Sequence, residues 1–310
     1  MSDRISTALK AKIHEWLDGS YCIGLIEGGY DVQNQCSAQL PPINRVKGVP
    51  KGSWLADPFI LSVDEDSVTL LVEEYRFQNT KGRLAKVEID TRTMMITHIA
   101  TILDMEFHLS FPYILRSEDK TFIIPESCAN SHVAIYELTG DGLKGGKTII
   151  DGPMLDSQLF QLESKYYAFT VRHTAEGMAE TKRLLVLESD TLQGPFSFIQ
   201  AIENDRCEER GAGAIFECEG KIIRPAQICE NGYGKGLVFY EIVLDNGKFQ
   251  EKELRRFYPE QKKRNGLCLH TFNACGNWAV VDGFDYKVRW LAKISPFFYK
   301  LKSIYNELRY

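Results

Sequence analysis

Charged side chains stand at matching places along this 310-residue chain, at the starts and ends of short apolar runs. The residues at the starts are Asp57, Asp156 and His270, and those at the ends are Glu74, Glu126, Arg172, Arg224 and Asp282. Cleavage of a glycosidic bond commonly needs two carboxyl groups: one protonates the leaving oxygen, and the other activates water or attacks carbon. This set of residues therefore indicates carbohydrate chemistry, provided that the fold brings them together.

Other residues have the side chains that a sugar pocket needs besides acids. Arginine can hold oxygen atoms with two parallel hydrogen bonds, and aromatic rings can stack on a sugar ring. The residues predicted to bind substrate are Trp54, Glu74, Phe111, Arg172, Arg210, Arg224, His270 and Asp282.

Two of these arginines bear on the charge of the ligand. Arg210 and Arg224 flank the small-residue segment Gly211-Ala212-Gly213, which leaves room for a ligand. We therefore expect an anionic group in the ligand, such as a phosphate or a uronate. The alternative is that either arginine pairs with a neighbouring acid such as Asp282 or Glu126.

Short strands in a fixed repeat must position these residues. A strand that ends in Glu, such as Val133–Glu137, recurs about every 50 residues, which is typical of a radial or stacked repeat. Two strands precede it in each of four repeats, a fifth repeat shows two strands, and a weakly marked outer strand is also expected. We predict an all-β, five-bladed β-propeller, in which the inner strands bring the charged strand ends together on one face.

Closure of the ring needs one more strand for the fifth blade. Either Cys22–Ile26 or Val288–Ile294 could supply it. The expected organisation is a short N-terminal helix over residues 1–20, the propeller over 21–295 and a C-terminal amphipathic helix over 296–310.

The predicted C-terminal helix is basic, although the whole chain is acidic. Its aromatic and apolar positions follow helical spacing, and Lys300, Lys302 and Arg309 lie among them. Such a helix can lie weakly and reversibly on an anionic membrane surface. The alternative is that its apolar stripe packs on the propeller or on a second subunit. The oligomeric state stays open.

The bulk composition excludes several kinds of function. The net charge of −5 and the pI of about 5.8 argue against a nucleic-acid partner. We expect a cytoplasmic protein, because no long apolar run and no signal-peptide core occur. The eight cysteines form no C-x-x-C pair and are expected to be reduced thiols, and neither a metal site nor a cofactor is expected.

The strand motifs resemble those of a known group of proteins. Ala56-Asp57-Pro58-Phe59 is similar to the base or nucleophile strand of the five-bladed propeller glycosidases of glycoside hydrolase families 32, 43, 68 and 130. The closer resemblance is to the propeller domain of glucosamine inositolphosphorylceramide transferases and to bacterial relatives, some of them fused to sugar formyltransferases. The motifs that carry it include Trp54 to Phe59, Glu73-Glu74-Tyr75 with Gly82, Ser110 to Tyr113 with Pro125-Glu126-Ser127, Arg210 to Gly213, Arg224 to Gln227 with Tyr233-Gly234, and His270 to Asn273 with Asp282-Gly283.

The resemblance implies roles for three acids. Asp57 would be the base or nucleophile. The hydrolase families usually place a second Asp in the first strand of blade two and an acidic Glu in blade three, whereas this chain has Phe111-Pro112 and Asp156 there. Glu126 is therefore the candidate proton donor, and Asp156 would hold charge or position.

Two functions remain in competition. The leading one is a carbohydrate-active propeller that acts on a glycan or sugar conjugate, glycoside hydrolase-like, with an acidic axial pocket. The alternative is a non-catalytic sugar-binding or scaffold propeller that assists a glycosyltransferase in glycan biosynthesis. In the plant proteins the transferase chemistry is expected in a separate domain that this chain lacks. A protein-interaction propeller of the WD or kelch type is disfavoured, because its repeat signatures are missing.

Overall fold

The computed structural model describes residues 20–28, 40–117, 119–140, 142–173, 183–203, 205–230, 234–259 and 269–285. The helices predicted over residues 1–20 (apart from Ser20) and 296–310, the alternative strand Val288–Ile294 and Tyr233 lie outside these residues. Within the described part of the chain, no helix is long and apolar enough to cross a membrane.

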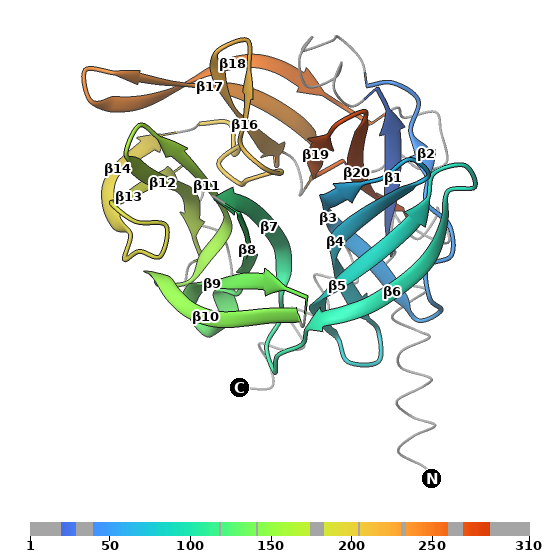
Figure 1. Cartoon of the computed structure of the whole chain (residues 1–310). Coiled ribbons are helices and arrows are strands. Elements are labelled where there is room, and N and C mark those ends of the chain that lie inside the picture. The colour runs from blue at the N-terminus through green and yellow to red at the C-terminus, as the bar shows by residue number, and fades with distance from the viewer. Residues whose placement is uncertain are drawn as a thin grey trace, which may run out of the picture.

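Five four-stranded antiparallel sheets surround a central axis, as Figure 1 shows, so the predicted five-bladed propeller is confirmed. We number the blades in the order in which their innermost strands occur in the chain. Blade 1 contains β3 (Ser53–Val63), β4 (Ser67–Arg76), β5 (Lys81–Asp90) and β6 (Met95–Leu103); blade 2 contains β7 (Ser110–Ser117), β8 (Lys120–Glu126), β9 (His132–Thr139) and β10 (Gly142–Asp151); blade 3 contains β11 (Met154–Leu162), β12 (Lys165–Arg172), β13 (Arg183–Ser189) and β14 (Ser197–Glu203); blade 4 contains β15 (Phe216–Cys218), β16 (Lys221–Ile228), β17 (Gly236–Asp245) and β18 (Lys248–Phe257); and blade 5 contains β19 (Phe272–Cys275), β20 (Trp278–Asp285), β1 (Ser20–Glu27) and β2 (Asn44–Arg45).

The N-terminal strand closes the ring. Strand β1 pairs with β20 along its whole length, from Ser20 opposite Asp285 to Glu27 opposite Trp278. The first of the two predicted closures is therefore correct. The weakly marked outer strands are also present, as β6, β10, β14 and β18. Closure of this kind joins the first part of the chain to the last and covers sheet edges that would otherwise be open.

Apolar side chains hold neighbouring blades together. Successive residues of a strand point to opposite faces of its sheet. In β4, Leu70 and Val72 pack into a cluster that includes strand β1 of blade 5, whereas Leu71 packs into a cluster shared with blades 2 and 3. Each blade is therefore apolar on both faces, and polar groups gather at the strand ends.

A bulge interrupts the innermost strand at the same place in blades 1, 2 and 3. The pairing register shifts between Ala56 and Phe59 in blade 1, and equivalent shifts occur in β7 and β11. The residues inside these bulges are Asp57, Phe111 and Asp156, with left-handed φ angles of 47°, 42° and 44°. A bulge bends its strand and redirects a side chain. It places Asp57 and Asp156 on the axial pocket.

Candidate functional site

The axial end of the propeller has a pocket of about 360 Å³ that is rich in ionisable groups. The side chains that line it lie in the strands of the blades or in the segments that connect them. They are Tyr21, Trp54, Asp57, Glu73, His108, Ser110, Glu126, Cys128, Leu155, Asp156, His173, Arg210 and His270.

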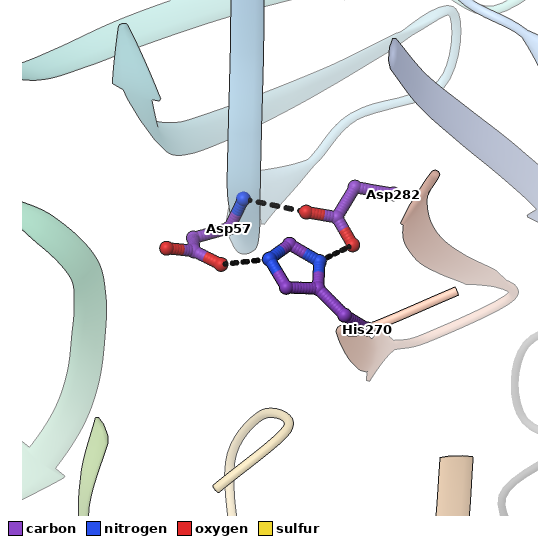
Figure 2. A group of neighbouring side chains, drawn as sticks. All are labelled: Asp57, His270 and Asp282. Carbon is purple, nitrogen blue, oxygen red and sulfur yellow. Dashed lines mark hydrogen bonds and ion pairs between the residues drawn. The ribbon is translucent and has the colours of Figure 1, made fainter. Parts of the chain in front are cut away.

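The first part of the site, which we call the histidine wall, consists of Asp57, His270 and Asp282 (Figure 2). Nδ1 of His270 lies 2.6 Å from Oδ1 of Asp282, and Nε2 lies 3.3 Å from Oδ1 of Asp57. The backbone N–H of Asp57 donates to Oδ2 of Asp282 over 2.9 Å, and that of Phe111 donates to Oδ2 of Asp57 over 3.1 Å. The imidazole is thus held between two carboxyl groups.

The charges of the histidine wall follow from its burial and its pairing. Burial raises the pKa of Asp57 to about 7, although His270 acts in the opposite direction. Burial alone would lower the pKa of His270, but the charge and hydrogen bond of Asp282 outweigh it and leave the pKa raised. Asp282 keeps a lowered pKa despite its burial, because His270, Thr271 and the Asp57 N–H all stabilise its anion. The protonation of Asp57 is therefore linked to the charge of His270.

The histidine wall also has the residue types of a metal site, and its donor atoms lie within 4.8 Å of one another. A metal ion needs lone pairs that converge on one point at about 2.0–2.2 Å. Here each ring nitrogen of His270 faces a carboxylate oxygen instead, and Asp282 also accepts hydrogen bonds from Thr271. The arrangement fits a chain of hydrogen bonds and ion pairs better than a metal centre.

The second part of the site, the arginine wall, consists of Glu126, Asp156 and Arg210. Nε of Arg210 lies 2.6 Å from Oδ2 of Asp156, and Nη2 lies 3.7 Å from Oε2 of Glu126. Gln227 also donates to Oδ2 of Asp156, over 3.2 Å. Burial raises the pKa of Glu126 to about 8, the charge of Asp156 adds to this effect, and Arg210 opposes it. Glu126 therefore holds a proton near neutral pH.

Glu73 lines the pocket, although the sequence pattern indicated its neighbour Glu74. Successive strand residues point to opposite faces. Glu74 is buried away from the pocket and pairs with Arg83 at 2.6 Å and with Arg76 at 3.1 Å. Two adjacent glutamates at the end of one strand were the available signal, but the strand pattern did not tell which of them would reach the pocket.

Aromatic rings form a row along one side of the pocket. Tyr21 of β1 stacks on His270 with 4.8 Å between ring centroids, and its ring lies 4.9 Å from that of Trp54. Trp54 in turn stacks on Tyr75 at 4.6 Å with nearly parallel planes. The prediction for Trp54 did not extend to Tyr21, because Tyr21 reaches the pocket only through closure of the ring.

The structure brings some of the predicted site residues to the pocket and leaves others outside it. The predicted residues that line the pocket are Asp57, Glu126, Asp156, Trp54, Arg210 and His270, and those that do not are Glu74, Phe111, Arg172, Arg224 and Asp282.

Besides Glu74, which pairs with Arg83 and Arg76, four predicted residues lie outside the pocket, each in a different place. Phe111 is buried against Phe59, and Asp282 holds His270 from behind the pocket. Arg172 is exposed at the end of β12. The fully buried Arg224 pairs with Glu251 at 2.5 Å. The alternative that this arginine pairs with an acid therefore holds, although the acid is neither Asp282 nor Glu126.

Five blades surround an axial pocket that is lined by several carboxyl groups. The chain belongs to the family described as glucosamine inositolphosphorylceramide transferase 1, N-terminal, whose model matches residues 43–281. This confirms the resemblance that the strand motifs indicated.

Relatives of known sequence carry the same family description. A glucosamine inositolphosphorylceramide transferase 1 from Oryza sativa subsp. indica is 26% identical over 299 residues, which cover 86% of this chain and 40% of the relative. The protein of the same name from Arabidopsis thaliana is 26% identical over 237 residues, which cover 73% of this chain and 31% of the relative. The chain therefore spans less than half of the length of these relatives.

Solved structures share the fold at low sequence identity. A β-1,3-galactosidase of family GH43 matches with a TM-score of 0.53 and 12% identity, over 69% of this chain and 50% of the other. An exo-β-1,3-galactanase from Phanerochaete chrysosporium matches with a TM-score of 0.52 and 9% identity, over 71% and 58%. At such identities the likeness concerns the fold alone.

Proposed function

We propose that this propeller binds a sugar or glycan conjugate in its axial pocket and acts on a glycosidic bond there. The observation that carries the proposal is that Asp57 and Glu126, two buried carboxyl groups with pKa values raised to about 7 and about 8, line one pocket. A protonated and an ionised carboxyl group on the same pocket are the two groups that glycosidic bond cleavage requires.

Each wall would contribute one half of the chemistry. Glu126 would donate its proton to the leaving oxygen, while Arg210 holds Asp156 beside it. Asp57 would act as base toward water or as nucleophile toward carbon. A positively charged His270 supports the ionised form of Asp57, and Asp282 fixes the orientation of the imidazole ring. The row of Tyr21 and Trp54 would stack on the sugar ring.

The charge of the pocket bears on the kind of sugar. The expectation of an anionic group depended on two arginines. Arg224 lies outside the pocket, and Arg210 is already paired with Asp156 and lies near Glu126. This geometry supports an uncharged sugar ring over an anionic one. The sugars in the names of the relatives and of the structural neighbours, glucosamine and galactose, agree with carbohydrate as the substrate class.

A second candidate is a sugar-binding propeller without catalysis that works beside a glycosyltransferase. Two observations favour it. Both carboxyl oxygens of Asp57 already face protein donors, the Phe111 N–H and His270. The plant relatives also extend well beyond the region that this chain matches, and the transferase activity in their name could lie there.

The two candidates are separated by measuring binding and turnover on the same ligands. Binding of galactose, glucosamine and N-acetylglucosamine is followed by saturation-transfer NMR, and turnover by release of 4-nitrophenol from the matching aryl glycosides. Release that disappears in Asp57→Asn and Glu126→Gln, with binding retained, supports the enzyme. Binding without release in the unmodified protein supports the binding module. Absence of binding and of release with every sugar contradicts both.

A further inference from the structure

We propose that Glu73 and His108 form a second polar end of the pocket, where the Glu73 carboxyl group donates a hydrogen bond to an oxygen atom of the bound sugar. The inference rests on the proposed function only in taking the ligand to be a sugar. It assigns a specificity role to a carboxyl group that the glycosidic mechanism described above does not use.

The first support for this proposal is an unsatisfied buried oxygen. Glu73 is only 5% exposed and lines the pocket. Its Oε1 atom makes no hydrogen bond to any of the residues that the structure describes. Buried polar atoms in proteins almost always have a hydrogen-bond partner, and exceptions often mark functional positions. Nε2 of His108 lies 3.3 Å from this oxygen without forming a hydrogen bond, so the carboxyl group keeps hydrogen-bonding capacity for a ligand in the pocket.

The second support is the orientation of His108. The backbone N–H of Gly82 donates to Nδ1 of His108 over 2.9 Å, so the neutral ring carries its proton on Nε2. Nε2 lies 3.3 Å from Oε1 of Glu73, and His108 also lines the pocket. The imidazole therefore presents an N–H to the same region as the carboxyl group.

The third support is the protonation of the pair. Burial raises the pKa of Glu73 well above its ordinary value, and burial lowers the pKa of His108. The neighbouring carboxyl groups whose ionised forms raise the Glu73 pKa further are Asp57, Glu126, Asp282 and Asp156. These effects favour the protonated form of Glu73, which has one O–H donor. A donor suits a sugar hydroxyl, ring oxygen or acyl carbonyl.

The strand next to Glu73 leaves space for its carboxyl group. A Cβ atom on Gly82 would lie 2.4 Å from Oε1 of Glu73 and 2.5 Å from the carbonyl oxygen of Leu109. Only glycine therefore fits at this position of β5 while the Glu73 side chain keeps its place. The close approach of β5 at Gly82 therefore fixes the position of the Glu73 carboxyl group on β4.

One experiment tests the protonation directly and needs no ligand. The side-chain carboxyl carbons are labelled with ¹³C, and Glu73 is assigned by comparison with Glu73→Gln. We expect the Glu73 signal to remain that of the protonated acid at pH 7. Titration of this signal below pH 7 would overturn the proposal.

A second experiment tests recognition of the sugar, with galactose and glucosamine as probes. Glu73→Gln keeps a hydrogen-bond donor and should bind about as tightly as the unmodified protein. Glu73→Leu removes it and should bind about tenfold more weakly. Equal weakening in both variants, or none in Glu73→Leu, would contradict the donor role.

A matched control separates recognition from folding. Glu241 in β17 also has a buried carboxyl oxygen without a hydrogen-bond partner among the described residues, but it lies outside the pocket. Glu241→Leu should leave sugar binding unchanged. If neither probe binds the unmodified protein, the proposed function fails for these sugars, and the carboxyl titration alone decides whether Glu73 is a donor.

Discussion

The histidine wall and the arginine wall place similar acids beside different cations. Asp57 and Asp156 occupy equivalent bulges in blades 1 and 3, and both face a positively charged side chain. His270 can lose its charge within the physiological pH range, whereas Arg210 remains charged at every pH that the protein meets. The two walls therefore respond differently to pH, although their backbones are alike.

This difference bears on the proposed base, Asp57, and the proposed acid, Glu126. On the histidine wall, the charge of Asp57 depends on the imidazolium that Asp282 stabilises. On the arginine wall, Asp156 pairs with the fixed guanidinium, and the remaining carboxyl group, Glu126, keeps its proton. Burial raises the pKa of both Asp57 and Glu126, and the cation beside each acid lowers it, so these two opposing effects together set the protonation of each carboxyl group.

The largest expected effect follows from removing one acid from either wall. Asp57→Asn and Glu126→Gln should each lower turnover about 10²- to 10⁴-fold, because each removes a proton-transfer group. The measurement is kcat on a substrate found by the aryl-glycoside screen, with circular dichroism and Tm as controls for folding. Full activity in both variants would reject the assigned roles.

Arg210 and Arg224 should differ in their effect on stability. Arg224→Met leaves the buried Glu251 without its partner and should lower the free energy of unfolding by about 3–5 kcal/mol. Arg210 is partly exposed at the pocket, so Arg210→Met should cost clearly less. Urea unfolding at pH 7 measures both. Equal losses would mean that Arg210 is as structural as Arg224.

The pH dependence of kcat/KM should separate the two walls. The proposed mechanism needs Asp57 ionised and Glu126 protonated, so the acidic limb should lie near pH 7 and the alkaline limb near pH 8, as apparent values of a coupled pair. His270→Gln removes a cation that lowers the pKa of Asp57, and the acidic limb should move to higher pH by about one unit. The active range would then narrow.

Arg210→Gln should have the opposite effect on the width of the profile. It removes the cation that lowers the pKa of Glu126, so the alkaline limb should move to higher pH and the active range should widen. The same assay over pH 5–10 gives both profiles. If both variants move the same limb, the division of the site into two walls is wrong.

The smallest effect is expected on the aromatic row. Tyr21→Leu removes a ring that stacks on His270 and lies beside Trp54, and it should weaken sugar binding by about 0.5–1.5 kcal/mol. Isothermal titration with the bound sugar measures the change. Phe198→Leu is the control, because Phe198 is an exposed ring on β14 outside the pocket. A similar loss in the control would remove the stacking role.

The sequence by itself determined the fold and much of the pocket. Strand alternation and turn residues are local signals, and their repetition about every 50 residues predicted five blades. The same repetition put Asp57, Glu126 and Asp156 at strand ends that meet at the axis, and the pocket contains all three. It also offered Cys22–Ile26 as the closing strand, which is part of β1.

Only the tertiary structure decided how these groups are paired. The bulges at Asp57 and Asp156 redirect these two side chains relative to those of a regular strand. The alternation of apolar and polar residues in the sequence does not predict the bulges. The choice between Glu73 and Glu74, and the burial of Arg224 against Glu251, likewise depend on which neighbouring strand lies opposite.

Partners in this site are far apart along the chain, which is the physical reason for that limit. The Asp57 N–H binds Asp282 across 225 residues, and the Phe111 N–H binds Asp57 across 54. Each pKa in the pocket is a sum over burial and over charges from several blades. Such sums exist only after the ring has closed, so the protonation of each acid is a property of the folded propeller.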